Sequence, residues 1–329
     1  MSAGLPAEVT VAIPTYNRKG LLRATLASVL EQQNVSFEVI VLDNASTDGT
    51  PEFVESMRDP RVQVSRATTN IGLIANFNRA LAAGNSPFLT VLHDDDLLRP
   101  GSLALRLELL KSDNSMAVAY SHYGVIDEHG GLTRPVYRSH IVSGSIEGTE
   151  AFLRAALHGQ VRCHMSAALI RRSSLGDLRC RQEDGSFTDH GLWMRLACCG
   201  SFGLIPLALA DVRVHSSAGA EMGNFRLDDD GNVVPFETEQ TVRTLGIARR
   251  VLNDAELAVP HRTRLRARAE IEGFRQLGRS VSADLAVPGT EFLGTVQRAL
   301  RAQPVAAVNR RLLLAAAVRV RNRVRSLLD

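Results

Sequence analysis

The sequence predicts an α/β protein with a mostly parallel sheet flanked by helices, for three reasons. Short apolar segments rich in β-branched residues alternate over residues 9–100 with segments whose apolar residues recur at helical spacing. The connections between these segments are short, which is typical of parallel strands joined by right-handed crossovers. A polar cluster follows each predicted strand, and ligands of open α/β sheets bind beyond the carboxyl ends of the strands.

The elements of this first part follow from their residue patterns. Strands are predicted at residues 9–15, 37–44, 62–67 and 87–94. The second has the continuous apolar character of a strand that is covered on both faces. Helices are predicted at residues 21–33, 50–57 and 72–84. Thr50 suits the N-cap of the second helix with Pro51 at its first position, and Gly84 suits the end of the third.

The pattern is looser from residue 101 to residue 215. Helices are predicted at residues 101–112 and 191–200, strands at 117–127 and 202–215, and a strand that runs into a helix at 165–175. A polar stretch rich in Gly and Asp then marks a boundary. We therefore predict one domain over residues 1–235 and a helical C-terminal region over residues 236–329.

The composition excludes several classes of protein. The net charge is only +3, and no basic stretch is interleaved with aromatic residues, so no nucleic-acid partner is expected. The N-terminus lacks the basic and apolar regions of a secretory signal, and no uncharged apolar run reaches the roughly 18 residues of a membrane span. These features predict a cytoplasmic protein.

The four cysteines do not form a recognisable site. Cys163, Cys180, Cys198 and Cys199 contain no C-x-x-C pair. Two adjacent cysteines are poor candidates for a disulfide framework or a zinc site. Reduced and mostly buried thiols are therefore expected.

Three consecutive aspartates, Asp94, Asp95 and Asp96, follow His93 at the end of the fourth predicted strand. Adjacent carboxylates repel one another, so they either lie on a solvated turn or surround a positive charge. Carboxylates after a strand suit Mg²⁺ or Mn²⁺, and Mg²⁺ leaves much of its shell to water and phosphate oxygens. A divalent metal with a nucleoside diphosphate is therefore expected here. A second triplet, residues 228–230, has no strand before it and is interpreted as a solvated turn.

Four motifs together resemble the nucleotide-binding half of inverting family 2 glycosyltransferases, which have the GT-A fold. They are VAIPTYNR (11–18), VLDNASTDGT (41–50), TTNIG (68–72) and VLHDDDLLRP (91–100). FTDHGLWMRLACCG (187–200) and DVRVHSSA (211–218) resemble later motifs of the same family. The resemblance covers about residues 8–215. It implies a Rossmann-like GT-A domain with a nucleotide-binding half at about 8–100 and an acceptor half at about 101–215.

The resemblance also implies roles for single residues. The implied nucleotide- and donor-binding residues are Pro14, Thr15, Tyr16, Arg18, Asp43, Asn44, Asn76, Asp94 and Asp95. The implied metal ligands are Asp95, Asp96 and His215. Asp189 would be the general base that deprotonates the acceptor.

The implied chemistry is metal-dependent transfer of a sugar from a UDP- or TDP-linked donor to an acceptor hydroxyl. Mg²⁺ or Mn²⁺ would neutralise the leaving diphosphate, and one carboxylate base would activate the acceptor. Without a second carboxylate as nucleophile, inversion at the anomeric carbon is expected. The acceptor is left open among a small molecule, a glycan and a lipid-linked molecule.

The chain departs from the family pattern at three positions. His93 stands where many relatives have Asp, so the pair of aspartates that binds the metal is open. Phe77 stands where many relatives have Arg, and Thr188 leaves Asp189 as the sole carboxylate of its motif. Two other functions therefore stay open: a nucleotidyltransferase, and a degenerate scaffold that binds nucleotide without turnover.

Several site candidates also have structural interpretations. Asp43 suits a turn and Asn76 suits the end of a helix. Asp189 is well placed to cap the helix that follows it. A lone histidine such as His215 is more often structural than a ligand. Trp193 is interpreted as a core residue, with a wall of the acceptor pocket as the alternative.

The C-terminal segment, residues 310–329, is a predicted basic helix with an apolar stripe. It could pack on the domain with its arginines solvated, which we prefer, or lie on an anionic membrane surface as a peripheral contact at the inner face. The loop at residues 216–236 is a candidate lid over the donor. The oligomeric state is left open, a homo-oligomer included.

Overall fold

The computed structural model describes residues 6–137, 144–148, 163–214, 225–227, 233–235, 237–259, 262–269 and 273. Two compact units divide the chain: Met1–Phe152 with Gln160–His215, and Leu153–Gly159 with Ser216–Asp329. The expectations for His215, for residues 228–230 and for the basic helix at 310–329 lie outside the described residues. The division into domains at residue 235 stays a prediction.

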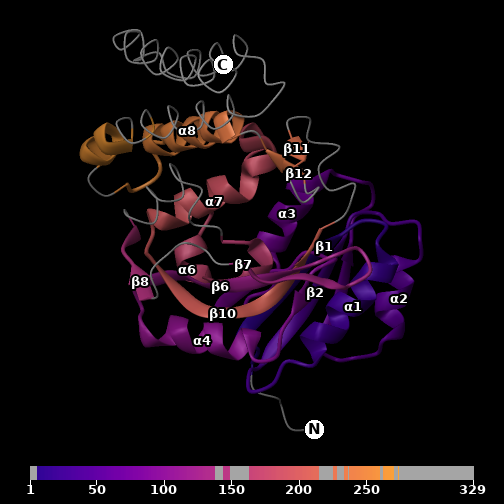
Figure 1. Cartoon of the computed structure of the whole chain (residues 1–329). Helices are drawn as coiled ribbons and strands as arrows, with labels where there is room; N and C mark the ends of the chain where they lie inside the picture. Colours follow the sequence, from indigo (N-terminus) through magenta and orange to yellow (C-terminus); the bar gives the residue numbers. More distant parts are fainter. Residues whose placement is uncertain are drawn as a thin grey trace, which may run out of the picture. The chain divides into compact units, whose positions relative to one another are not determined.

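The first unit is built on one sheet (Figure 1). Its strands are β1 (Val9–Thr15), β2 (Phe37–Asp43), β3 (Val62–Arg66), β4 (Phe88–Val91), β5 (Leu97–Leu98), β6 (Met116–Ile126), β7 (Leu132–Tyr137), β8 (Gly144–Ile146), β9 (Ala168–Arg171) and β10 (Ser201–Arg213). They lie in the order β3-β2-β1-β4-β9-β6-β10-β5, with β7 beside β6 and β8 beside β10. The pairs among β1 to β4 and the long pair β6–β10 are parallel, whereas β9, β5, β7 and β8 pair antiparallel. The predicted α/β class with a mostly parallel sheet is confirmed.

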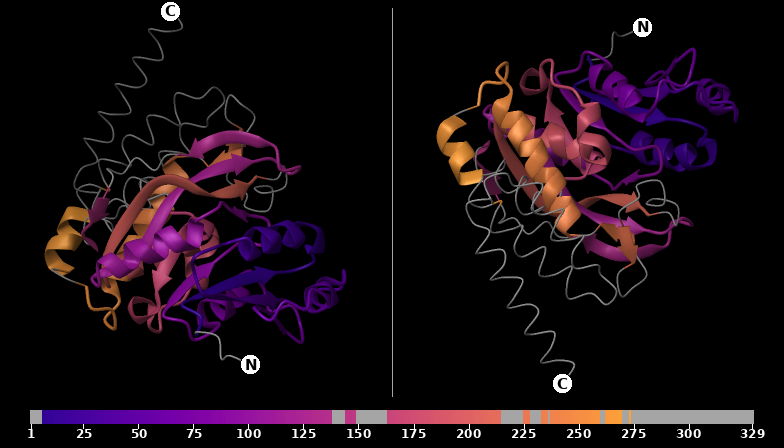
Figure 2. Two further views of the ribbon diagram at one scale, coloured as in Figure 1. Left: turned by 90° about the horizontal axis from the view of Figure 1, so that it is seen from below. Right: turned by 90° about the horizontal axis from the view of Figure 1, so that it is seen from above.

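Helices cover both faces of this sheet (Figures 1 and 2). They are α1 (Lys19–Leu30), α2 (Thr50–Ser56), α3 (Leu73–Ala82), α4 (Ser102–Ser112), α6 (Arg172–Leu175) and α7 (Thr188–Ala197), with 3₁₀ turns η1 (Met165–Ala167) and η2 (Gln182–Phe187). Apolar residues of α1, α2 and α4 share one core with β1 and β2. Figure 1 shows α3 and α7 on the opposite side of the sheet from α1 and α4. Because helices cover both faces, every residue of β1 is buried.

The start of α2 differs from the sequence-based expectation. Thr50 was predicted as the N-cap, but the helix begins at Thr50 and the preceding Gly49 is its N-cap. Gly49 has φ 81°, a left-handed conformation that glycine adopts without steric cost. The carboxylate of Asp48 instead accepts hydrogen bonds from the Thr50 N–H (3.1 Å) and hydroxyl (2.5 Å). Its other oxygen accepts the Lys19 N–H at the start of α1 (3.0 Å), so Asp48 stabilises the starts of two helices.

Trp193 of α7 belongs to the core, as expected. It is 1% exposed, and its ring lies edge-on to Phe202, with 6.4 Å between the ring centroids. Phe202 in turn lies edge-on to Tyr120. Of the four cysteines, Cys163 and Cys180 are buried as expected, whereas Cys199 is exposed.

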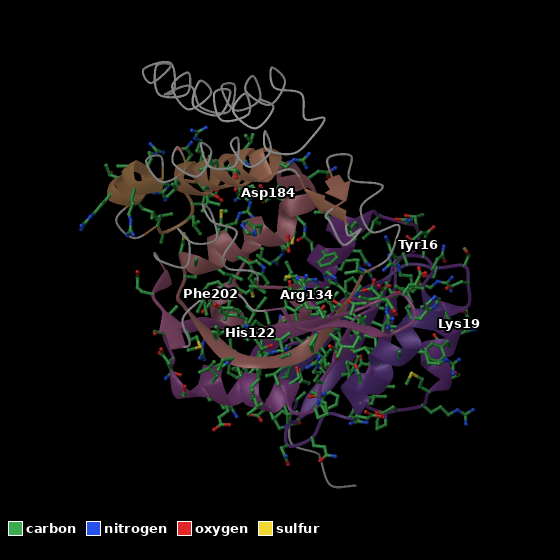
Figure 3. The ribbon with its side chains drawn as sticks, in the orientation of Figure 1. Tyr16, Lys19, His122, Arg134, Asp184 and Phe202 are labelled. Carbon is green, nitrogen blue, oxygen red and sulfur yellow. The ribbon has the colours of Figure 1, made fainter. Side chains whose placement is uncertain are left out.

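A buried ion pair joins α7 to the turn before it. Asp184 of η2 (labelled in Figure 3) accepts a hydrogen bond from the Arg195 guanidinium, and both side chains are almost fully inaccessible. A Cβ atom on Gly191 would lie 2.1 Å from Asp184 Oδ2, so this pairing needs a glycine at that position. The pair therefore fixes the first turns of α7, where Asp189 lies.

The second unit contains the described strands β11 (Phe225–Leu227) and β12 (Val233–Pro235), which pair antiparallel, and the helix α8 (Glu237–Asn253). Leu245, Val251 and Leu252 of α8 are buried. Gly273 packs so closely on this helix that an added Cβ would lie 2.3 Å from Leu245 Cδ2. In the part of the chain that the structure describes, no helix combines the length and apolar character needed to span a membrane.

The Asp184–Arg195 pair generates a stability prediction. Asp184→Asn leaves a buried guanidinium without its counter-charge, so we expect the free energy of unfolding to fall by about 3–5 kcal/mol. Urea denaturation monitored by circular dichroism measures this change. Glu183→Gln is the matched control, because Glu183 lies 4.0 Å from Arg181 in an exposed pair. That control should cost less than about 1 kcal/mol, and equal losses in both variants would contradict the assigned role of the buried pair.

Candidate functional site

The polar segments that follow β1, β2 and β4 meet at one edge of the sheet. Thr15 and Asp43, the last residues of β1 and β2, are register partners, and β4 pairs with β1 on its other side. The Thr15 hydroxyl donates a hydrogen bond of 2.6 Å to Asp94 Oδ2 in the turn after β4. The sheet topology therefore brings together residues that are about 80 positions apart in the chain.

Asp94 and Asp95 converge on one cation. Arg18 Nη1 lies 3.2 Å from Asp94 Oδ1 and 2.7 Å from Asp95 Oδ2. Both carboxylates are buried, while the arginine is half-exposed. Burial raises the pKa of Asp94, and the Thr15 hydrogen bond and the Arg18 charge oppose this rise. Two oxygen donors that already share one cation fit the ligand preference of Mg²⁺ or Mn²⁺.

Asp43 has one oxygen committed and one without a partner. Oδ2 accepts the Ser46 N–H (3.1 Å) and lies 3.8 Å from Arg66 Nε. Oδ1 is buried and has no hydrogen-bond partner among the described residues. A buried carboxylate oxygen without a donor is costly, so it marks a position where a ligand N–H would be stabilising. Asp43 can therefore serve in both ways that the sequence left open: Oδ2 stabilises the turn, and Oδ1 is available to a ligand.

Asn44 and Asn76 direct their amides into the protein. Asn44 Nδ2 donates to Asn70 Oδ1 (2.8 Å), and Asn44 Oδ1 accepts the Ile71 N–H (2.9 Å). Asn76 Nδ2 donates to the Leu42 carbonyl (2.9 Å). Both side chains are buried, and these bonds hold the end of β2 and the loop before α3 in place. Direct contact of either residue with a donor stays a prediction.

The loops after β1 and β2 are tied to each other by residues that the sequence analysis did not assign. The Asn17 N–H donates to Ser46 Oγ, and the Thr47 N–H donates to Asn17 Oδ1, both at 2.8 Å. Asn17 and Ala45 have φ of 53° and 63°, in the left-handed region. Pro14, within β1, is buried, whereas Tyr16 (labelled in Figure 3), just after β1, is 43% exposed.

Arg79, which the sequence analysis did not assign, contacts residues at the same edge. Its guanidinium donates to the Asp43 carbonyl (3.2 Å) and to Asn76 Oδ1 (2.9 Å). The same group donates to the carbonyl and hydroxyl of Ser65. Arg79 thus joins the carboxyl ends of β2 and β3 to α3. Its spacing from Asn76, three residues along one helix, was the available signal in the sequence.

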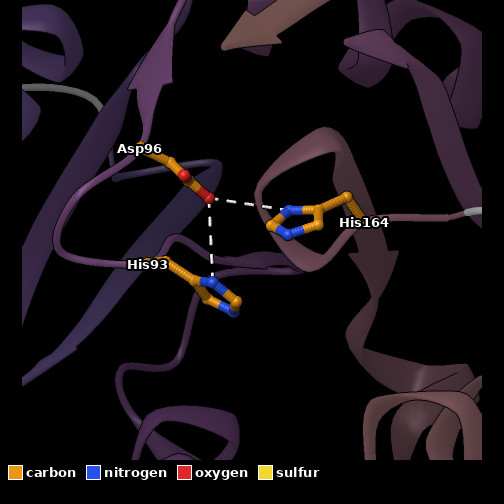
Figure 4. Close-up of side chains that lie close together, drawn as sticks. All are labelled: His93, Asp96 and His164. Atoms are coloured by element: carbon orange, nitrogen blue, oxygen red, sulfur yellow. Dashed lines mark ion pairs between the residues drawn. The ribbon is translucent and has the colours of Figure 1, made fainter. Parts of the chain in front are cut away.

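Asp96 belongs to a different cluster from Asp94 and Asp95. Its Oδ2 accepts the Ser166 hydroxyl (2.5 Å), and its Oδ1 accepts the Arg213 N–H (2.8 Å). His93 Nδ1 and His164 Nδ1 lie 3.7 and 3.6 Å from Oδ2 (Figure 4). Asp96 is 1% exposed, and burial raises its pKa.

The two histidines were not among the sequence-based candidates. His93 directly precedes the aspartate triplet, which was a signal that the sequence analysis used only as a departure from the family pattern. His164 lies between Cys163 and the 3₁₀ turn η1, where no motif marks it. The aspartate triplet is therefore divided between an arginine and a pair of histidines.

Asp189, the implied general base, lies in the first turn of α7, because the helix begins one residue earlier at Thr188. Its Oδ1 accepts the His190 N–H (2.8 Å). Burial lowers the pKa of His164, and the Asp189 charge partly opposes this effect, so the two side chains interact electrostatically. The catalytic role of Asp189 stays a prediction.

Comparison with known proteins connects this geometry to one family. The model of the family described as "Glycosyl transferase family 2" matches residues 10–179, more than half of the 329-residue chain. A "Putative teichuronic acid biosynthesis glycosyltransferase TuaG" of Bacillus subtilis is 29% identical over 124 residues. That match covers 37% of this chain and 49% of TuaG, so the chain spans about half the length of this relative.

Solved structures show the same fold. S. aureus TarS 1–349 in complex with UDP-GlcNAc aligns with a TM-score of 0.63 and 16% identity over 97% of this chain and 92% of that chain. Mannosyltransferase PcManGT from Pyrobaculum calidifontis, in complex with GDP-Man and Mn²⁺, aligns with a TM-score of 0.52 and 19% identity over 96% and 88%. At sequence identities this low, the alignments establish similarity of fold alone. The shared fold is the predicted GT-A fold.

The role of Asn44 generates a prediction about local stability. In Asn44→Ala the Ile71 N–H loses its acceptor, which is worth about 1 kcal/mol and corresponds to about fivefold faster hydrogen exchange at that amide. Hydrogen exchange followed by NMR measures the rate. Asn78→Ala is the matched control, since the Asn78 amide bonds only to the Cys180 backbone in the described residues. Unchanged exchange at Ile71 in Asn44→Ala would contradict the assignment.

Proposed function

The chain belongs to glycosyltransferase family 2, and we propose that it transfers a sugar from a nucleoside diphosphate donor to an acceptor hydroxyl. The observation that carries this proposal is the convergence of the buried Asp94 and Asp95 carboxylates on one cation, at the sheet edge where Asp43 also lies. Two carboxylates that can hold a divalent cation, at an edge that also carries a buried, unpaired acceptor, suit a nucleotide with a diphosphate. UDP-GlcNAc and GDP-Man, which are bound in the TarS and PcManGT complexes, are donors of this class.

Donor recognition would begin at the base. Asp43 Oδ1 is the unpaired acceptor, so it can accept the imide N–H of a uracil or thymine base from a UDP- or TDP-linked sugar. Tyr16, exposed on the loop after β1, offers an aromatic face to the base, and Pro14 and Thr15, the implied donor-binding residues before it, are buried. The hydrogen bonds between Asn17 and the loop after β2 would hold the loops after β1 and β2 in place before the donor binds.

Asp94 and Asp95 would hold a divalent cation, Mg²⁺ or Mn²⁺. That cation, when bound, would neutralise the negative charge of the leaving diphosphate. Arg18 currently balances both carboxylates and is half-exposed, so its guanidinium can turn to the phosphate oxygens when another cation takes its place. Asp96 was also implied as a ligand of this cation, but its carboxylate lies against His93 and His164, whereas those of Asp94 and Asp95 lie against Arg18.

Asp189 would deprotonate the acceptor hydroxyl. It lies half-buried in the first turn of α7. One general base acting on the acceptor, without a carboxylate nucleophile, corresponds to a single displacement with inversion at the anomeric carbon. The acceptor stays open among a small molecule, a glycan and a lipid-linked molecule.

Thermal stabilisation by nucleotides tests the donor site. A matching nucleoside diphosphate with Mn²⁺ or Mg²⁺ at a hundred times its Kd should add about 2.7 kcal/mol, which raises Tm by about 5 °C. Asp95→Asn should abolish the metal-dependent part of this shift. Asp59→Asn is the matched control, because Asp59 pairs only with the nearby Arg61 in the described residues. An unchanged shift in Asp95→Asn, or no shift with any nucleotide, would overturn the proposed donor site.

Turnover separates the enzyme from the two alternatives that the sequence left open. Asp189→Asn should lower kcat by at least about a hundredfold, because general base catalysis contributes about that much, and should leave the nucleotide-induced rise in Tm intact. Product analysis by ion-exchange chromatography should show a nucleoside diphosphate. Release of pyrophosphate would indicate a nucleotidyltransferase, and full kcat in Asp189→Asn would remove Asp189 from the mechanism.

A further inference from the structure

His93, Asp96 and His164 form a cluster, the His93–Asp96–His164 cluster, whose ligand-type atoms all lie within 4.8 Å of one another. Figure 4 shows both imidazole rings directed at the Asp96 carboxylate. Nδ1 of His93 and Nδ1 of His164 lie 3.7 and 3.6 Å from Asp96 Oδ2. Ions such as Zn²⁺ bind nitrogen and oxygen at about 2.0–2.2 Å, so two ligands of one ion can lie up to about 4.2 Å apart. The two distances to Asp96 fall within that limit, whereas the 4.8 Å span of the whole cluster means that the imidazole rings must move slightly closer together to share one ion.

Hydrogen bonding does not account for this arrangement. A separation of 3.6 or 3.7 Å between nitrogen and oxygen is too long for a hydrogen bond. His164 Nδ1 is buried and lacks a hydrogen-bond partner among the described residues. Leaving such an atom unpaired is costly, and a bound cation would satisfy it.

The surroundings hold the three side chains in place. Ser166 and the Arg213 N–H bind the two oxygens of Asp96 and fix the orientation of the carboxylate, as outer partners of metal ligands do. The His93 ring lies edge-on to Phe77, with 5.4 Å between centroids, and the His164 ring lies 5.5 Å from that of Tyr123. The three side chains are therefore held near one another before any ion binds.

The chemistry of the ligands selects the kind of ion. Two imidazoles and one carboxylate suit divalent first-row transition metals such as Zn²⁺ and Co²⁺, whereas Mg²⁺ prefers oxygen ligands alone. The all-oxygen pair of Asp94 and Asp95 faces Arg18 and is a chemically different site.

We propose that the His93–Asp96–His164 cluster binds a divalent transition metal ion that favours imidazole ligands, independently of the nucleotide and of the cation held by Asp94 and Asp95. Such an ion would join the turn after β4 to the segment that enters β9. The proposal does not depend on the proposed transfer reaction, because its ligands are separate from those assigned to the donor.

Metal binding to the full chain without nucleotide tests this proposal. Zn²⁺ titration by calorimetry should show one site, and Co²⁺ should give visible absorption bands of nitrogen and oxygen coordination. His93→Gln and His164→Gln should each weaken binding by at least about tenfold. Asp95→Asn should retain the site, and His129→Gln is the matched control, because His129 is exposed.

Two results would overturn the proposal. One is Zn²⁺ or Co²⁺ affinity that is unchanged in both His93→Gln and His164→Gln. The other is binding that appears only with a nucleoside diphosphate and disappears in Asp95→Asn, which would place the ion at the donor site. Circular dichroism and Tm of each metal-free variant show whether it is folded. If His164→Gln does not fold, His93→Gln still tests the site, because the His93 side chain is partly exposed.

Discussion

The need to stabilise three adjacent, buried carboxylates at the end of β4 organises this site. Asp94, Asp95 and Asp96 are each less than a tenth exposed, and charges removed from water are costly unless each is paired and hydrogen bonded. The structure meets this requirement with partners from separate elements. Thr15 and Arg18 lie at and just after the end of β1, Ser166 precedes β9, and Arg213 ends β10. The partners of the triplet therefore connect the parallel half of the sheet to its later strands.

The end of β10 also contacts the turn after β4 and the strand that follows it. Beyond the Arg213 N–H bond to Asp96, the Arg213 guanidinium donates to the Asp95 carbonyl and to the Asp127 carbonyl. Arg99, which follows the short strand β5, pairs with Asp211 two residues earlier on β10. Two arginines thus hold the end of β10 against the turn.

Most of the fold could be predicted from the sequence, because it follows from local periodicity. β1, β2 and α3 were expected within two residues of their observed bounds, since each has a strong apolar pattern and a clear stop signal. The start of α2 was wrong by one residue because the left-handed Gly49 and the Asp48 side chain share the capping role that was expected of Thr50.

The site was less predictable than the fold, because its contacts join distant parts of the chain. The polar loops that follow the predicted strands were sufficient to predict that Thr15, Asp43 and Asp94 lie at one edge of the sheet. The partners of Asp96 could not be found this way: Ser166 and Arg213 lie 70 and 117 residues further along the chain. These contacts turn Asp96 toward the histidines while Asp94 and Asp95 face Arg18. No sequence motif indicates such contacts.

Strained backbone at the donor edge is consistent with a site that is arranged before its ligand binds. Asn17 and Ala45 both have positive φ, and the left-handed conformation costs a residue with a side chain roughly 1–2 kcal/mol. Such strain persists only where neighbouring contacts determine the conformation. Here the reciprocal bonds between Asn17 and the Ser46–Thr47 segment supply those contacts. Folding already supplies the free energy that the left-handed conformations of Asn17 and Ala45 require. A ligand that contacts both loops therefore does not lose binding free energy by imposing them.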